Sequence, residues 1–460
     1  MPDRRSLPAH ALPWVIWALA FHILGIALLF GYFHLSISVV QVIASWKEIT
    51  GLLLLAIIVV RSATGRGPRA TVAASDLFAA GWIALALVFF ATENVLLRDL
   101  IPTKAAVFGV RDASFFVIFY FIGRGTPELG DDYRLMKHAF AVLCVTSAIA
   151  VAEQIFITPQ ILVAIGVASY VQNFLGVEAY TQGNMYGLPD NYWSEMGGHL
   201  VRRSGSVFLS SQGFAMIFIV LMPLATLWLL RNRNTIRWTH RTWYFVIWAG
   251  LIATFTRTAI LVAAVQAVII FAMRRRVTGA ALVVSAAVVT VLTSMAVFPS
   301  IATFIFETLT WQTGSSASHL KDWVNGATAF LEQPWGYGLG TTDQTAVRVG
   351  LEPITADNLY LKYAVELGVP GLVALLGTLG CMGMAGFCAA RDSVHSASRD
   401  LGAAVLLIML GVVVYGMTST MFNDPIVGYL TFWLGGTAVT LAQRSAVPAH
   451  RPLKDAVGYA

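Results

Sequence analysis

Three arginines occupy positions where a mostly apolar chain would hold a charge only at a cost. Arg257 separates two unusually short apolar runs in LIATFTRTAILV, and Arg202 and Arg203 directly precede a third run. A guanidinium can fork onto phosphate oxygens through parallel N–H donors. We interpret Arg257, together with Arg202 or Arg203, as a site for an anion such as a diphosphate. Position alone does not separate Arg202 from Arg203.

Each arginine also has a simpler explanation. Arg257 could cap or snorkel at the tip of a helical hairpin. One of Arg202 and Arg203 could instead be held by lipid headgroups at the membrane surface. Neither explanation needs a ligand, so both stay open at this point.

A second polar group lies in the segment ITADNLYLKYAVELGVPG. Asp357 could accept a proton from a hydroxyl nucleophile, although it or Asn358 could equally cap the helix that follows. Tyr360 is a residue that could stack on a sugar or pack against a neighbour. Glu366 follows Lys362 by one helical turn, so a salt bridge between them is the simpler interpretation and Glu366 is a secondary substrate-binding candidate.

Two further charge pairs are Arg111–Asp112, inside the fourth predicted span, and Lys47–Glu48, before the apolar part of the second. Charges inside a membrane segment are costly, and structural pairing is the simplest reason for keeping them. Adjacent residues on a helix point in different directions, however, so direct contact within each pair is not expected.

The sequence indicates no metal site and no disulfide framework. The histidines of the predicted outer segments have no His or carboxylate partner at a metal-binding interval, and we interpret them as surface residues; they are His34, His199 and His319. The cysteines fall inside predicted helices without ligand spacing; they are Cys144, Cys381 and Cys388. Walker and dinucleotide glycine motifs are also lacking, and no cofactor is expected.

The elements that must position these residues are membrane helices. Of the 460 residues, 57% are apolar and only 12% are charged, a balance far outside that of soluble domains. Apolar runs long enough to cross or nearly cross a bilayer predict about twelve spans, at 12–33, 37–60, 75–92, 104–123, 135–156, 206–230, 242–256, 258–273, 278–298, 368–390, 402–420 and 425–443. We therefore predict an all-α membrane protein, with residues 1–460 forming one polytopic domain.

The distribution of basic residues predicts the orientation. The segments RNRNTIRWTHR at 231–241 and RRR at 274–276 place their side of the protein in the cytoplasm. Both termini are then cytoplasmic, and the first apolar run is a span rather than a removed signal peptide. The net charge of +6 follows from these short basic loops, so nucleic acid is not an expected partner.

Two long segments on the outer side interrupt the hydropathy pattern, at 157–205 and 299–367. Both exceed the usual length of a connection, which favours a functional role. We predict an interfacial helix at 161–176 in the first. Leu320, Trp323 and Phe330 share one face of a predicted amphipathic helix in the second, which ends before Pro334.

Three stretches of the chain together resemble the O-antigen ligase and polymerase superfamily of bacterial envelope glycosyltransferases. They are RRSGSVFLSSQGFA at 202–215, TRTAIL at 256–261 with its arginine-x3-leucine pattern, and HLKDW…EQPWGYGLG…DNLYLKYAVELGVPG at 319–371. The ligases carry a histidine about ten residues before a glycine in the last stretch. Here Asp357 takes the histidine's place and Gly368 that of the glycine, which favours a polymerase of exopolysaccharide, capsule or O-antigen over a lipid A-core ligase.

The resemblance implies a metal-independent membrane glycosyltransferase of the bacterial inner membrane. It would transfer a glycan, with inversion, from an undecaprenyl-diphosphate-linked oligosaccharide to a sugar hydroxyl on the periplasmic face. Arg257 and Asp357 would be catalytic, and membrane lipid, an acceptor glycan, a flippase and a chain-length regulator would be partners. The alternatives are ligation to lipid A-core and, from another class, transport of lipid-linked oligosaccharide. A transporter should show an internal hydropathy repeat and charges near the midplane.

Overall fold

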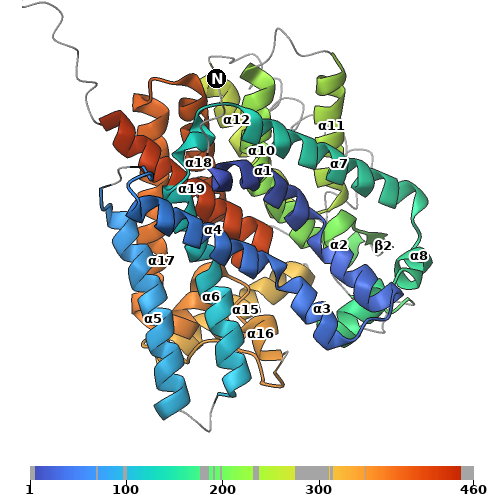
Figure 1. Ribbon diagram of the computed structural model, residues 1–460. Coiled ribbons are helices and arrows are strands. Elements are labelled where there is room, and N and C mark those ends of the chain that lie inside the picture. The colour runs from blue at the N-terminus through green and yellow to red at the C-terminus, as the bar shows by residue number, and fades with distance from the viewer. Residues whose placement is uncertain are drawn as a thin grey trace, which may run out of the picture.

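The computed structural model is built almost entirely of helices, as the sequence predicts (Figure 1). It describes residues 6–68, 71–96, 101–176, 186–189, 192–196, 199–231, 238–274, 310, 314–347 and 349–446. Within these residues one antiparallel hairpin interrupts the helices, with β1 (Trp193–Met196) pairing Trp193 to Arg202 of β2 (His199–Arg202). The all-α membrane class is confirmed, and the hairpin is an element that the sequence pattern did not indicate.

Eight helical segments among the described residues are long and apolar enough to cross a membrane. They are α3 (Ile37–Ala44) continued by α4 (Trp46–Ala63), α5 (Ala74–Leu96), α6 (Thr103–Arg124), α7 (Arg134–Phe156), α10 (Ser211–Arg231), α17 (Leu359–Asp392), α18 (Ser396–Tyr415) and α19 (Pro425–Ala446). A ninth is formed if the bent pair of α1 (Leu7–Ala20) and His22–Tyr32 is one span.

Of the remaining predicted spans, two form short helices and one lies outside the described residues. The runs 242–256 and 258–273 form two shorter helices, α11 (Trp238–Ala253) and α12 (Arg257–Met273), joined at a tight turn. The run 278–298 lies outside the described residues. The count of about twelve spans and the assignment of the long segments to the periplasm therefore stay predictions.

The helices α6 and α19 approach closely because small residues line their contact. A Cβ atom on Gly123 would lie 2.0 Å from the carbonyl oxygen of Trp433. Tyr120 and Trp433 are both fully buried beside this contact. Small residues allow backbones in a membrane bundle to come close and gain van der Waals contact, which is the main attraction available there.

The helix α17 bends at Gly368, where the backbone has φ 66° and leaves helical geometry. A side chain is excluded here, since a Cβ would lie 2.5 Å from the carbonyl carbon of Trp335. The PWGYG segment docks on the bend: Val369 N donates to Pro334 O at 2.9 Å, and Tyr337 N donates to Val365 O at 2.7 Å. Gly368 thus allows the bend of α17 to pack tightly against the loop before it.

The two long segments differ in structure: the described helices of the first are all short, whereas those of the second are one longer helix and a short one. The amphipathic helix predicted in 299–367 is α15 (Gly314–Glu332), which packs on α17 and is followed by α16 (Asp343–Val347). The helix predicted at 161–176 is broken into α8 (Pro159–Ala164), α9 (Val167–Ser169) and a π-helical turn (Tyr170–Phe174). In Figure 1, α15, α16 and α3 lie in the lower half of the molecule, and α16 packs against α6.

Candidate functional site

Arg203 is fixed onto the turn that carries Arg257. Its Nε donates to the carbonyl oxygen of Thr254 at 2.9 Å and its Nη2 donates to Thr256 Oγ1 at 2.8 Å. Thr256 is the residue before α12, and Arg257 is the first residue of that helix. Burial, with a smaller contribution from the charge of Arg257, lowers the pKa of Arg203 to about 10. Two guanidinium groups therefore lie close together at a helix N-terminus, a place that favours an anion.

Arg202 points elsewhere and completes the end of α7. Its Nη1 donates to the carbonyl oxygen of Ile157 and its Nη2 to that of Glu153. Gln154 Nε2 in turn donates to the carbonyl oxygen of Arg202 at 3.0 Å. The last carbonyls of a helix lack partners within the helix, and a cation there satisfies both their hydrogen bonding and the helix dipole. The structure thus separates the two arginines that the sequence could not.

The loop that carries both arginines is held by a buried carboxylate on α7. Glu153, only 3% exposed, accepts hydrogen bonds from Ser204 Oγ at 2.5 Å and from Ser206 N at 2.7 Å. Ser206 has φ 48°, a left-handed conformation that costs energy for a residue with a side chain. Glu153 was not singled out from the sequence, because a lone acid inside an apolar run gives no hint of what it will meet.

Asp357 forms an ion pair with His319, which the sequence placed on the surface. His319 Nδ1 lies 2.7 Å from Asp357 Oδ2, and the two side chains are 23% and 34% exposed. Hydrogen bonding to Asp357 raises the pKa of His319 above its usual 6.5, against the opposing effects of burial and of Arg257. The backbone of Asp357 has φ 31°, another strained conformation of the kind that clusters at functional sites. The interpretation of His319 as a plain surface histidine was wrong.

Asn358 is the N-cap residue of α17, so Asp357 does not cap this helix. Its Oδ1 accepts from Tyr360 N at 2.9 Å and from Leu361 N at 3.1 Å, and its Nδ2 donates to the carbonyl oxygen of Met417 at 3.0 Å. Tyr360 directs its hydroxyl to the carbonyl oxygen of Val413 at 2.9 Å, on α18. Both residues are engaged in holding the start of α17, next to Asp357.

Glu366 is buried behind the site. It is 2% exposed and accepts a hydrogen bond from Thr342 Oγ1. Lys362, its expected partner, instead donates to Asn423 Oδ1 at 3.0 Å and lies 4.0 Å from Asp343 Oδ2. Glu366 therefore supports the short loop after the PWGYG segment rather than pairing with the lysine one turn before it.

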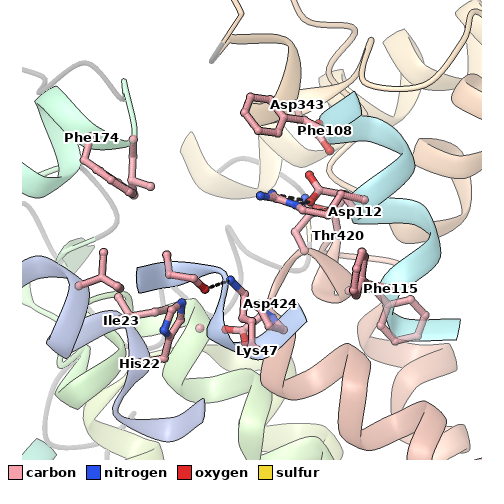
Figure 2. A pocket seen from close by; sticks show the side chains of 18 of the residues that line it. His22, Ile23, Lys47, Phe108, Asp112, Phe115, Phe174, Asp343, Thr420 and Asp424 are labelled. Atoms are coloured by element: carbon pink, nitrogen blue, oxygen red, sulfur yellow. Dashed lines mark hydrogen bonds and ion pairs between the residues drawn. The ribbon is translucent and has the colours of Figure 1, made fainter. Parts of the chain in front are cut away.

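Asp357 faces a large cavity of about 1410 Å³ between the N-terminal helices, α6, α16 and the start of α19 (Figure 2). Asp343 and Asp322 share its wall with Asp357, and aromatic side chains such as Phe108 and Phe174 line other parts. Among the predicted site residues Asp357 alone contributes to the lining in the described part of the chain. Asp357 thus lies on the cavity wall in contact with His319, and the charge of Arg257 acts on the same imidazole.

The arrangement provides three chemical functions in one region. Arg203 and Arg257 can stabilise negative charge on a ligand or leaving group. Asp357, backed by His319, can take up a proton. The cavity can hold a ligand larger than a typical small-molecule substrate. Among the described residues, no three His, Cys, Asp or Glu side chains are placed to hold a metal ion together.

One comparison with known proteins bears on this region. Residues 242–376 match the family model described as O-Antigen ligase. No curated protein matches the chain. The matched segment contains Arg257, His319 and Asp357 and ends within α17. This match confirms the resemblance to the O-antigen ligase and polymerase superfamily over residues 242–376, and it supports a glycosyl-transfer role of the ligase or polymerase type.

Proposed function

We propose that this protein, which resembles the O-antigen ligase and polymerase superfamily over residues 242–376, polymerises the repeat units of a surface polysaccharide. The donor is a glycan linked to undecaprenyl diphosphate, the acceptor is a sugar hydroxyl, and transfer takes place at the periplasmic face of the bacterial inner membrane. No nucleotide takes part, because the lipid diphosphate is itself the leaving group, and the charge on it is stabilised by the arginines in place of a metal ion. A flippase would deliver the donor, and a chain-length regulator would act on the product.

The observation that carries this proposal is the contact of His319 with Asp357. It puts a carboxylate at the cavity surface, with 2.7 Å between its Oδ2 and the imidazole Nδ1. The charge of Arg257 acts on the same imidazole. A group that can accept a proton and a group that can stabilise a leaving anion are thus both linked to the imidazole of His319.

The reaction can be written on these side chains. The acceptor hydroxyl gives its proton to Asp357 while its oxygen forms a bond to the anomeric carbon of the donor. The bond from that carbon to the diphosphate oxygen breaks, and its electron pair leaves with undecaprenyl diphosphate. Arg203 and Arg257 stabilise the charge that develops on this oxygen. A single displacement of this kind inverts the configuration at the anomeric carbon.

A polymerase and a ligase differ in what accumulates when the protein is lost. A strain deleted for this protein is expected to carry single repeat units in place of long chains, because each unit would reach the cell surface without extension. Gel profiling of surface and lipid-linked glycans measures this directly. The deletion strain complemented with the unchanged protein, at equal membrane level, is the control.

Other glycan profiles would overturn the assignment. Long chains stranded on the lipid carrier would identify a ligase instead, in keeping with the description of the matched family. An unchanged distribution of chain lengths on both surface and carrier would count against glycan transfer of either kind.

The titration of His319 predicts a pH dependence. Because its pKa is raised above 6.5, the protonated imidazole that holds Asp357 is fully present below pH 6.5. The ion pair is then lost as the pH rises through the raised pKa of the folded protein. The initial rate of glycan transfer is expected to fall over the same interval.

The variant His319→Gln keeps a hydrogen-bond donor but not the charge. It should be about tenfold slower than the unchanged protein at pH 6.5, from the difference between a charged and a neutral hydrogen bond, and should lose the decline at higher pH. The control His34→Gln, at an exposed turn, should still show the decline in rate at higher pH. A His319→Gln profile that still declines like that of the unchanged protein would exclude His319 as the titrating group.

A further inference from the structure

Two charge pairs on α4 and α6 line the same cavity as Asp357 but take no part in the transfer step described above. Lys47 Nζ lies 3.1 Å from Glu48 Oε1, and Arg111 Nη2 lies 2.7 Å from Asp112 Oδ1. The sequence argument against direct contact between adjacent residues was wrong for both pairs. All four residues line the cavity, so the two side chains of each adjacent pair are directed toward the same space.

Arg111 and Asp112 lie inside α6, and Lys47 and Glu48 lie at the junction of α3 and α4, inside the candidate span Ile37–Ala63. Along the helix axis Lys47 is about 15 Å from Ile37 and Arg111 about 12 Å from Thr103, measured from the ends predicted to face the periplasm. Ionisable groups at such depth are expensive unless they line a polar cavity and serve a ligand. A purely structural pair would gain nothing from being open to the cavity, yet the side chain of Arg111 is 36% exposed.

The two pairs form one cluster because α4 packs on α6. The charges of Arg111 and Asp112 act on Lys47, and the charge of Glu48 acts on Arg111. Figure 2 shows Lys47 and Asp112 on the wall of one open space, with Phe174 on another part of its border. The cluster thus offers donors and acceptors side by side in a nearly neutral group.

The chemistry of this cluster differs from that of Arg203 and Arg257. The guanidinium of Arg203 meets neutral oxygens, whereas each cation here already has a carboxylate beside it. Arg111 binds Asp112 through Nε and Nη2, and its Nη1 makes no hydrogen bond within the described residues. The ring of Phe108 lies 5.2 Å from the guanidinium carbon. Paired charges beside an aromatic face suit a polyhydroxylated ligand better than a second phosphate.

A short helix connects this cluster to Asp357. Thr345 Oγ1 donates to Asp112 Oδ2 at 3.1 Å. Thr345 belongs to α16, whose first residue Asp343 also lines the cavity and is affected by the charge of Asp357. A ligand held by the cluster can therefore extend along one continuous wall to the carboxylate.

We infer that Lys47–Glu48 and Arg111–Asp112 form a saccharide subsite that holds the acceptor glycan. The inference rests on the proposed function and assigns the two substrates to two different groups of charged residues near Asp357. The diphosphate of the donor lies with Arg203 and Arg257, and sugar residues of the acceptor lie in the cavity, with their hydroxyls hydrogen-bonded to the cluster.

Direct binding tests this subsite apart from catalysis. The probe is a fluorescent oligosaccharide of two or three repeat units, released from the polysaccharide of the host cell and titrated into purified full-length Asp357→Asn protein in detergent. Adding Arg111→Gln or Lys47→Gln should raise the dissociation constant by about 10- to 100-fold, as expected for losing a charged hydrogen bond. Arg61→Gln removes a comparable ion pair, 3.3 Å from Glu128 and outside the cavity lining, and should leave binding unchanged.

The outcomes separate this inference from the proposed function. Equal binding by the Arg111→Gln and Lys47→Gln proteins, each eluting as a single folded species, would overturn the subsite, as would the lack of saturable binding by the Asp357→Asn protein itself. Neither result touches the transfer reaction, which is measured independently from product formation. In active protein the same substitutions should raise the acceptor concentration at half-maximal rate and leave that of the donor unchanged.

Discussion

Replacing Arg257 by alanine is expected to lower the rate of glycan transfer by about 10²- to 10³-fold, the loss usual for one group that stabilises a developing oxyanion. The residue begins α12 beside Arg203, so its guanidinium can neutralise charge on a diphosphate as the glycosidic bond breaks. Arg257→Lys should recover only part of the rate, because an ammonium keeps the charge but not the paired donors. The measurement is initial rate in membranes with equal protein levels.

The neighbouring arginines provide matched controls. Arg203→Ala should resemble Arg257→Ala, since the two guanidinium groups adjoin. Arg202→Ala should lower thermal stability while retaining most of the turnover of the folded protein, because Arg202 completes the carbonyl end of α7. Full activity of Arg257→Ala, or an equal loss of turnover in folded Arg202→Ala, would contradict this assignment of the arginines.

Replacing Asp357 by asparagine is expected to slow transfer by about 10²- to 10⁴-fold, the range for removing a general base. Asparagine keeps the size of the side chain and can still contact His319, so the cavity wall should be preserved. What is lost is the carboxylate that takes the hydroxyl proton. Initial rates at saturating donor and acceptor isolate this step from binding.

A control for Asp357→Asn is the same substitution at an acid far from the site. Asp132 lies 3.4 Å from Arg134 at the start of α7, on the side predicted to be cytoplasmic, and Asp132→Asn should be fully active. If Asp357→Asn turned over at the unchanged rate, the acceptor hydroxyl would have to lose its proton to another group, and the central role of the pair with His319 would fail.

Much of the fold and part of the site could be predicted because the signals are local. The hydropathy of the apolar runs identified the membrane helices, namely α3 with α4, α5, α6, α7, α10, α17, α18 and α19. Arg257 stood out because it interrupts an apolar segment, and Asp357 because it precedes a helix. In both cases the informative feature lies within a few residues of the side chain.

The rest could not be predicted because it depends on contacts between distant segments. Nothing near His319 indicates that α15 folds back on the start of α17 and brings the imidazole to Asp357. Arg202 and Arg203 have almost identical surroundings in the sequence, and only the course of the loop around Glu153 sends them in opposite directions. The contact of Arg111 with Asp112 was not predicted, because adjacent residues on an exposed helix point in different directions. Here both side chains are directed into the same cavity, where they meet.

We propose that Asp357 and Arg257 together carry out glycan transfer from a lipid diphosphate. The decisive experiment uses purified protein, an undecaprenyl-diphosphate-linked repeat unit and a chelator, without nucleotide. Longer glycans should form together with one released undecaprenyl diphosphate per new glycosidic bond, and Asp357→Asn and Arg257→Ala should reduce both products equally. Transfer that required a nucleotide sugar or a metal ion, or that proceeded unchanged in both variants, would contradict it.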